Sequence, residues 1–293
     1  MGVDAAVTVS ADGKLLYVAL GSSVLVVDSD SLTTVDEIFY PHTRPVAVSS
    51  DNKLLAIFGS ELYILNTSDY SLVFSDTGEY EYKSGVFSSD SKAFYCASTP
   101  NTSTDYGVLR VDMSDSLYPI TKRNFSSGTV TQVIPSLDES KWFLYLAVGL
   151  STYSFEVYDN GLDTIVFTDV LIPGAGYTDN TSDGKYVFYT NPGRTGTDPP
   201  TDYSIKIYNV STNEIEAVIA DTSYFVFGQV PGPPKRLAVT PDNRWLGILG
   251  GQMFLTNFYL YDICNEKLVY RKGPDTILFK LNDYRSMSIQ NMK

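Results

Sequence analysis

Short apolar runs alternate with polar turns along the whole chain, and one pattern returns at intervals of 39 to 59 positions. The pattern is an apolar strand, a turn with an acidic residue followed by Lys or Arg, and a second apolar strand. Intervals of this size are typical of four-stranded repeat units, with insertions in the longer ones. The seven turns are Asp12-Gly13-Lys14, Asp51-Asn52-Lys53, Asp90-Ser91-Lys92, Glu139-Ser140-Lys141, Asp183-Gly184-Lys185, Asp242-Asn243-Arg244 and Asp283-Tyr284-Arg285.

A second pattern interleaves with the first: an apolar strand that ends in Asp or Asn, a turn, and a further strand. Asx side chains bond to the backbone two residues on, which explains their recurrence without implying any chemistry. Four strands are therefore predicted in each repeat; in the first they lie near Ala6–Ser10, Leu15–Leu20, Val24–Asp28 and Thr33–Ile38. The six strands that end in Asx are 24–28, 62–66, 108–112, 155–159, 205–209 and 258–262.

Two segments resemble the YVTN family of repeat proteins: Tyr17-Val18-Ala19-Leu20 and Phe188-Tyr189-Thr190-Asn191 occupy the second-strand position where that family carries its signature. The resemblance covers nearly the whole chain and implies an all-β fold, a YVTN or WD40-like β-propeller of four-stranded antiparallel blades. We expect seven blades with the last incomplete, or alternatively six. The predicted repeats cover residues 5–45, 46–84, 85–130, 131–175, 176–235, 236–275 and, in part, 276–293.

Composition agrees with one β-rich domain over residues 1–293. Hydrophobic residues make up 43% of the chain and aromatic residues 13%, which is ample for a packed core. A net charge of −13 argues against nucleic acid as a partner, because phosphate recognition rests on clustered Lys and Arg. No apolar run is long enough to span a membrane, and the oligomeric state is left open.

We expect binding on the face formed by the loops that join the second strand to the third and each blade to the next. The largest insertions, 98–107, 191–204 and 221–235, all belong to these loops, and long loops on a rigid scaffold often carry function. Aromatic side chains with a few charges suit a protein or a glycan, although those near 224–227 are equally explained by packing. The candidate binding residues are His42, Arg44, Tyr80, Tyr82, Tyr106, Arg194, Tyr203, Tyr224 and Phe225.

Catalytic patterns are scarce. His42 is the only histidine, which excludes multi-histidine metal sites and disfavours a Ser-His-Asp triad, so no metal, cofactor or catalytic residue is predicted. The YVTN family also includes lactonase-like enzymes and quinoprotein dehydrogenase subunits, so the resemblance implies an enzyme or enzyme subunit as an alternative. In that alternative Arg44 and Arg194 would hold an anionic substrate and His42 would move a proton. A third alternative is an intracellular scaffold.

Asn-x-Ser/Thr sequons favour an exported or cell-surface protein that carries glycans, with a cytoplasmic location as the alternative. A chain rich in Asn, Ser and Thr also contains some sequons by chance, and turns concentrate these residues. The five acceptors are Asn66, Asn101, Asn124, Asn180 and Asn209. Our leading hypothesis is a non-catalytic propeller at the cell surface that binds a protein or glycan through its loop-rich face.

Overall fold

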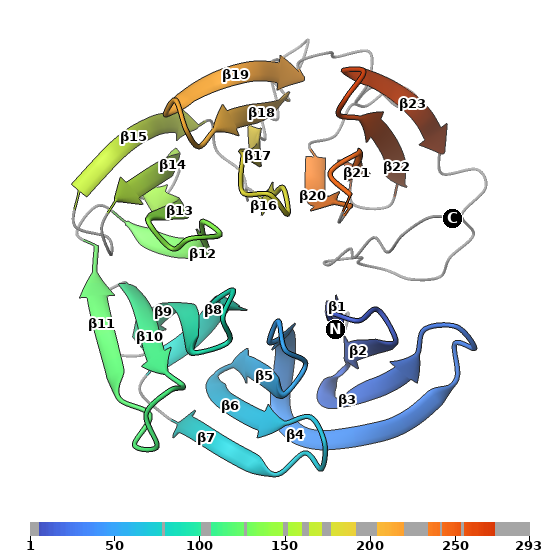
Figure 1. The fold of residues 1–293 in the computed structure, drawn as a ribbon, viewed down its shortest axis with the longest axis vertical. Helices are drawn as coiled ribbons and strands as arrows, with labels where there is room; N and C mark the ends of the chain where they lie inside the picture. Colours follow the sequence, from blue (N-terminus) through green and yellow to red (C-terminus); the bar gives the residue numbers. More distant parts are fainter. Residues whose placement is uncertain are drawn as a thin grey trace. The chain divides into compact units, whose positions relative to one another are not determined.

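The computed structural model is all-β and describes residues 6–77, 80–100, 107–125, 128–148, 152–159, 164–171, 177–191, 204–219, 234–240, 242–252 and 255–272. A seven-stranded sheet has the order β1 to β7, and four further sheets have four strands each (Figure 1). In the first sheet β4 is long enough to pair with β3 through its first half and with β5 through its second. It therefore ends one blade and begins the next, and the described strands form six blades.

The blades follow the chain in order. Blade 1 contains β1 (Ala6–Val9), β2 (Leu15–Ala19), β3 (Gly21–Asp28) and the first half of β4 (Thr34–Val48); blade 2 contains the rest of β4 with β5 (Leu54–Gly59), β6 (Glu61–Asn66) and β7 (Leu72–Thr77). Blade 3 contains β8 (Tyr80–Phe87), β9 (Ala93–Pro100), β10 (Gly107–Asp112) and β11 (Ile120–Asn124); blade 4 contains β12 (Thr129–Pro135), β13 (Lys141–Val148), β14 (Thr152–Asp159) and β15 (Thr164–Leu171). Blade 5 contains β16 (Thr178–Asn180), β17 (Tyr186–Asn191), β18 (Ser204–Asn209) and β19 (Glu214–Ile219); blade 6 contains β20 (Pro234–Val239), β21 (Trp245–Gln252), β22 (Leu255–Asp262) and β23 (Lys267–Lys272).

This architecture confirms the predicted fold class, and the six blades agree with the alternative count. Residues 276–293, predicted as a partial seventh blade, lie outside the described residues. By their contacts the strands form two compact units, one containing β1–β12 with β13 up to Leu146, and the other containing the last two residues of β13 with β14–β23. The described part contains no helix long and apolar enough to cross a membrane.

The turn between the first two strands of every blade has the same length and the same internal bonding. A Ser or Thr hydroxyl donates to the Asp two positions later, as in Ser10 Oγ to Asp12 Oδ1 at 2.7 Å and Ser88 Oγ to Asp90 Oδ1 at 2.8 Å. The same carboxylate oxygen accepts the backbone N–H two residues further on, as from Lys92 at 3.0 Å. These turns occupy residues 10–14, 49–53, 88–92, 136–140, 181–185 and 240–244.

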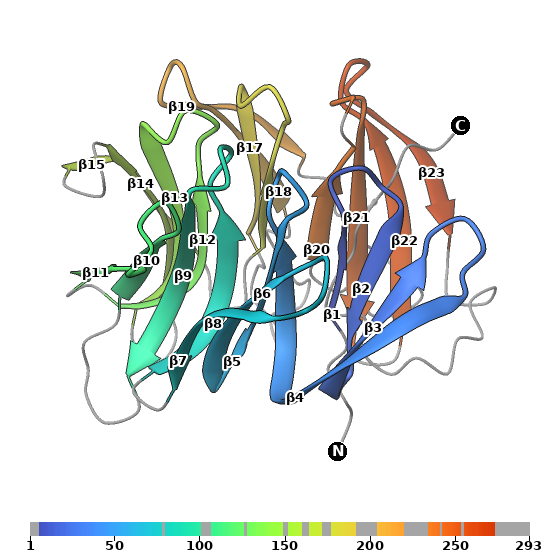
Figure 2. The same ribbon diagram turned by 60° about the horizontal axis from the view of Figure 1, so that its bottom comes forward.

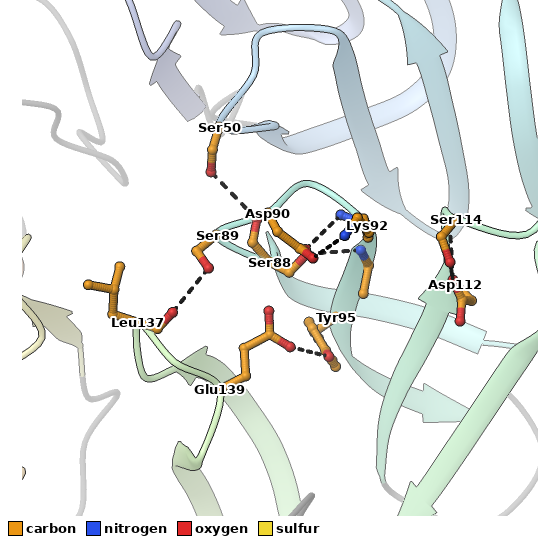
Figure 3. A network of polar contacts seen from close by, with 11 residues as sticks. Ser50, Ser88, Ser89, Asp90, Lys92, Tyr95, Asp112, Ser114, Leu137 and Glu139 are labelled. Carbon is orange, nitrogen blue, oxygen red and sulfur yellow. Dashed lines mark hydrogen bonds and ion pairs between the residues drawn. The ribbon is translucent and has the colours of Figure 1, made fainter.

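Neighbouring turns within each unit also bond to one another. Figure 3 shows the turn of blade 3, where Ser89 Oγ donates to the carbonyl of Leu137 at 3.0 Å and Tyr95 donates to Glu139 at 2.8 Å. In the second unit, the backbone N–H of Ser182 donates to Asn243 Oδ1 at 2.7 Å. The acid-containing turns therefore connect successive blades, which is a structural role.

One turn differs from its prediction. In blade 4 the acid that accepts the Ser136 hydroxyl is Asp138, and the following position is taken by Glu139 with a φ of 56°. The predicted Glu139-Ser140-Lys141 alignment was therefore one residue late, and Ser140 stands where other blades have Lys or Arg. Because Asp138 and Glu139 are adjacent acids, either fits the turn pattern. The position of Ser136, two residues before Asp138, identifies the correct alignment.

The third strand of most blades ends in an Asx turn that contains a serine. Asp28, Asn66, Asp112 and Asn209 each accept a hydrogen bond from the hydroxyl of a nearby serine. Two of these turns, at Asn66 and Asn209, are also predicted sequons. The sequon at both positions is thus accounted for by the turn, whether or not a glycan is present.

One face of blade 1 is partly exposed, although the equivalent face of blade 2 is buried. In blade 2, Leu55, Ile57 and Leu65 face blade 1 and are fully buried. Their counterparts in blade 1, identified by strand register, are Leu16, Val18 and Val27, and all three are only half-buried. On the same blade Phe39 is 73% exposed. Within the described part of the chain, this side of blade 1 therefore remains incompletely covered.

Candidate functional site

The structure describes few of the predicted binding residues. Tyr106, Arg194, Tyr203, Tyr224 and Phe225 lie outside the described residues. So does the sequon at Asn101. His42 and Arg44 lie within β4, but their side chains are not described. The roles proposed for these seven residues remain predictions.

Tyr80 and Tyr82 lie together on β8 but differ in exposure. Tyr82 is 1% exposed and its hydroxyl donates to Asp76 Oδ2 at 2.7 Å, so the ring is part of the core. Burial and this bond raise the pKa of the Tyr82 hydroxyl far above its usual value. Tyr80 is half-buried, with Lys122 Nζ 4.5 Å from its ring centroid. Of the two, only Tyr80 offers surface to a partner.

Connection lengths distinguish the two ends of the blades. The turns between first and second strands are all equal in length, whereas the opposite strand ends are joined by connections that range from the single residue Ser60 to residues 192–203 and 220–233. Both long connections begin or end in blade 5. Figure 2 shows the strands of the blades side-on, so that these two sets of ends can be compared. Variable loops on a uniform scaffold are typical of a recognition surface.

Aligning the blades on their Asx turns identifies two unusual charges. Three residues before the Asx, the third strand has Leu25, Tyr63, Leu109 or Tyr259 in four blades. In blades 2, 3 and 6 this side chain packs against the preceding blade. The same position holds Glu156 in blade 4 and Lys206 in blade 5. Charged groups at packed positions are costly unless they are paired, and each of these two has hydrogen-bond partners.

Glu156 is satisfied within its own strand. It is 5% exposed and accepts hydrogen bonds from Ser154 Oγ at 3.0 Å and from the Tyr158 hydroxyl at 2.6 Å. Both donors are two residues away and project from the same side of β14. This compact arrangement is sufficient to explain how the carboxylate is accommodated in the interior.

Lys206 instead bonds across to the neighbouring blade. Its Nζ lies 2.6 Å from Asp169 Oδ2, and the Tyr189 hydroxyl donates to the same oxygen at 2.7 Å. Asp169 comes from β15, Tyr189 from β17 and Lys206 from β18, which lie in adjacent blades of the second unit (Figure 1). Tyr189 is fully buried and stacks on Phe155 with ring centroids 4.0 Å apart. The hydroxyl that fixes Asp169 is therefore held rigidly by packing.

The three residues lie at the end of the blades from which the variable connections leave. Asp169 and Tyr189 are each two residues before the end of their strands, and Lys206 is two residues after the start of its strand. The side chains of Lys206 and Asp169 retain 18% and 16% exposure. We call Asp169, Tyr189 and Lys206 the blade 4–5 charge cluster. It is a partly accessible ion pair beside the longest second-to-third-strand connection.

Another carboxylate in the same unit, that of Asp179, has a raised pKa. Asp179 on β16 accepts the backbone N–H of Val239 on β20 at 2.7 Å, and so joins blades 5 and 6. Although the side chain keeps some exposure, desolvation raises the pKa of Asp179 to about 6. Among the described residues no cation is near enough to lower this pKa, and the carboxylate accepts hydrogen bonds from the backbone N–H groups of Val239 and Asn180. Asp179 therefore links blades 5 and 6 through a carboxylate whose pKa is raised.

Among the described residues, no three His, Cys, Asp or Glu side chains gather as a metal site would require. The blade 4–5 charge cluster can instead exchange hydrogen bonds with a ligand, because it presents the Asp169 carboxylate and the Lys206 ammonium group side by side.

Comparison with known proteins agrees with the architecture. No family model matches the chain, and no curated protein is significantly similar. Among solved structures, hydrazine synthase of Kuenenia stuttgartiensis superposes with a TM-score of 0.73 at 16% identity, covering 97% of this chain and 88% of that one. The β-propeller domain of Cps50 (Swd1) from Myceliophteria thermophila superposes with a TM-score of 0.72 at 10% identity, covering 93% and 86%.

The fold is a β-propeller. At these identities the likeness establishes the propeller fold alone, since the same fold carries many unrelated functions.

Sequence reasoning missed the blade 4–5 charge cluster. Tyr189 was noted only as part of a signature segment, and Asp169 and Lys206 were not singled out. A signal was nevertheless present: alignment of the six Asx-ending strands places one lysine among leucines and tyrosines. Comparison of repeats position by position would have found it.

Proposed function

We propose that this chain is a non-catalytic propeller, exported or displayed at the cell surface, that binds a protein or glycan through its loop-rich face. The observation that carries the proposal is the contrast between equal turns at one end of the blades and variable connections at the other. Equal turns with shared bonding stabilise the scaffold, whereas variable connections change the surface without changing the scaffold. The partly exposed blade 4–5 charge cluster lies at the variable end and supports the same assignment.

The acidic surface is compatible with this role. A net charge of −13 keeps the chain soluble and favours neutral or cationic partners over anionic ones. Tyr80, half-buried at the start of β8, supplies aromatic surface at the variable end. Aromatic residues are enriched among those that contribute most to binding.

The test uses a combined variant of three tyrosines, Tyr80→Ala, Tyr106→Ala and Tyr224→Ala. Wild type and variant are screened against a peptide-display library and an array of immobilised oligosaccharides. We expect the variant to lose at least about tenfold in affinity for ligands of the wild type, because aromatic anchors dominate interfaces. Thermal unfolding verifies that the variant is folded.

The matched control changes the opposite end of the blades. Lys14→Ala, Lys53→Ala and Lys92→Ala remove three exposed side chains from the equal turns and are expected to leave binding unchanged. Ligands that bind the tyrosine variant normally but fail with the lysine variant would place the binding surface on the wrong face and overturn the proposal.

Location has its own measurement. Intact mass of protein from its natural source, before and after enzymatic deglycosylation, reports glycans directly. A decrease by hexose-containing masses supports export, and an unmodified chain contradicts it. Site mapping adds detail, because the Asn209 amide donates to Glu216 at 2.6 Å and the residue is 8% exposed, whereas Asn66 is more exposed. We therefore expect Asn66 to be modified before Asn209.

A further inference from the structure

We propose that Asp169 and Lys206 form a recognition subsite for a neutral, hydroxyl-rich ligand, that is, a glycan. The inference rests on the proposed function and names the chemistry of its ligand. The subsite is the ion pair at the variable end of blades 4 and 5, with Tyr189 behind it as the positioning residue.

The pair has unused hydrogen-bonding capacity. An ammonium group offers three donors, and Lys206 uses one of them on Asp169. The Asp169 Oδ2 atom accepts from both Lys206 and Tyr189, while Oδ1 has no partner among the described residues. Because both side chains are partly exposed, these groups are accessible from solvent. A ligand can therefore bond to both without separating the pair.

The ligand class follows from the charge of the pair. Asp169 and Lys206 together are neutral, so a charged ligand group would gain one attraction and one repulsion. A hydroxyl group donates one hydrogen bond and accepts up to two. It can donate to Asp169 Oδ1 and accept from Lys206 Nζ, and charge-assisted hydrogen bonds of this kind are stronger than neutral ones. Sugars present several such hydroxyls on a rigid ring.

The scaffold does not require this pair. At the next interface of the same unit, the matching positions hold Ile219 of blade 5 and Tyr259 of blade 6, both buried. Replacing a buried ion pair by packed apolar residues is often neutral or stabilising. An ion pair retained where an apolar pair packs equally well is explained by binding better than by stability.

The experiment measures glycan binding in three variants. Asp169→Ile with Lys206→Tyr replaces the ion pair by the two residues that occupy the same positions at the blade 5–6 interface. Asp169→Asn removes the charge alone, and Asp76→Asn makes the same change at the equivalent position of blade 2, where Asp76 also accepts a tyrosine hydroxyl. The probes are an array of neutral oligosaccharides and, in parallel, the peptide-display library.

We expect the wild type and Asp76→Asn to bind the same neutral oligosaccharides, and both changes at Asp169 to weaken that binding by about tenfold or more. The double variant, with Tyr189→Phe added so that no buried hydroxyl is left without its Asp169 acceptor, should unfold at the same temperature as wild type or higher, which separates recognition from stability. Neutral glycans that bind the double variant unchanged would overturn the subsite and leave the proposed function standing.

Two other outcomes would overturn the ligand class or the proposed function. If wild type binds peptides but no oligosaccharide, the ligand class is wrong and the propeller binds proteins. If neither the array nor the library yields a ligand, the proposed function fails and the subsite fails with it.

Discussion

The blade 4–5 and blade 5–6 interfaces of the second unit fill the same repeat positions with opposite chemistry. At the first, Asp169 and Lys206 pair under a tyrosine hydroxyl; at the second, Ile219 and Tyr259 pack in the core. Strand order and register are the same on both sides. The difference shows that the propeller scaffold tolerates either solution, and that polarity at this position is available for purposes other than folding.

The largest expected effect comes from breaking one side of the ion pair. Asp169→Ile alone leaves Lys206 at a packed position without its partner, which should lower the free energy of unfolding by about 3 kcal/mol. Urea unfolding monitored by tryptophan fluorescence measures it. Adding Lys206→Tyr should restore most of the loss, and failure of this rescue would mean that the two interfaces are not interchangeable.

The next effect concerns the carboxylate that joins blades 5 and 6. The pKa of Asp179 is about 6 in the folded chain and near 3.8 when unfolded, so the folded state binds the proton more tightly. Its contribution to stability is fully present below pH 3.8 and is lost as the pH rises through 6. As the pH rises from 4 to 7, the free energy of unfolding of Asp179→Asn should therefore increase by about 2 kcal/mol relative to that of wild type.

Urea unfolding at several pH values tests this prediction. Asp169→Asn, which makes the same change in a carboxylate at the blade 4–5 interface, serves as the control variant. Equal pH profiles for wild type and Asp179→Asn would show that the link between blades 5 and 6 does not titrate in this range.

The smallest effect compares two tyrosines that make the same bond. Tyr189→Phe and Tyr82→Phe each remove a hydroxyl that donates to an aspartate, and each should cost about 1 to 2 kcal/mol. Because Lys206 still pairs with Asp169, we expect the smaller loss at Tyr189. Thermal unfolding of the two variants in parallel measures both losses of stability. A larger loss for Tyr189→Phe would show that the Tyr189 hydroxyl is needed to hold the ion pair.

The scaffold was predictable because its local signals repeat. Turns such as 10–14 and 49–53 combine a capping acid with a residue of positive φ, at Gly13 and Asn52, and such turns depend on neighbouring residues alone. The error at Glu139 arose where two acids are adjacent and either satisfies the pattern. Blade number was less predictable, because the strands pair consecutively and local turn signals do not determine how many such repeats pack together.

The candidate site was less predictable for a physical reason. Asp169 and Lys206 are 37 positions apart, and only the packing of adjacent blades brings them together. Tyr82 was predicted to bind, but its burial depends on the contact with blade 2 through Asp76. Exposure and pairing of this kind are tertiary properties, although the repeat alignment does show which positions are unusual.

The Asx turns have a consequence for the chemical ageing of the chain. Deamidation converts asparagine to aspartate, and blades 1 and 3 already use Asp28 and Asp112 where blade 2 has Asn66. The oxygen that accepts the serine bonds is present in both forms, so damage at Asn66 leaves a turn of a kind that the protein already contains. Asn209 lacks this tolerance, because its amide nitrogen donates to Glu216 and an aspartate there would face that carboxylate instead.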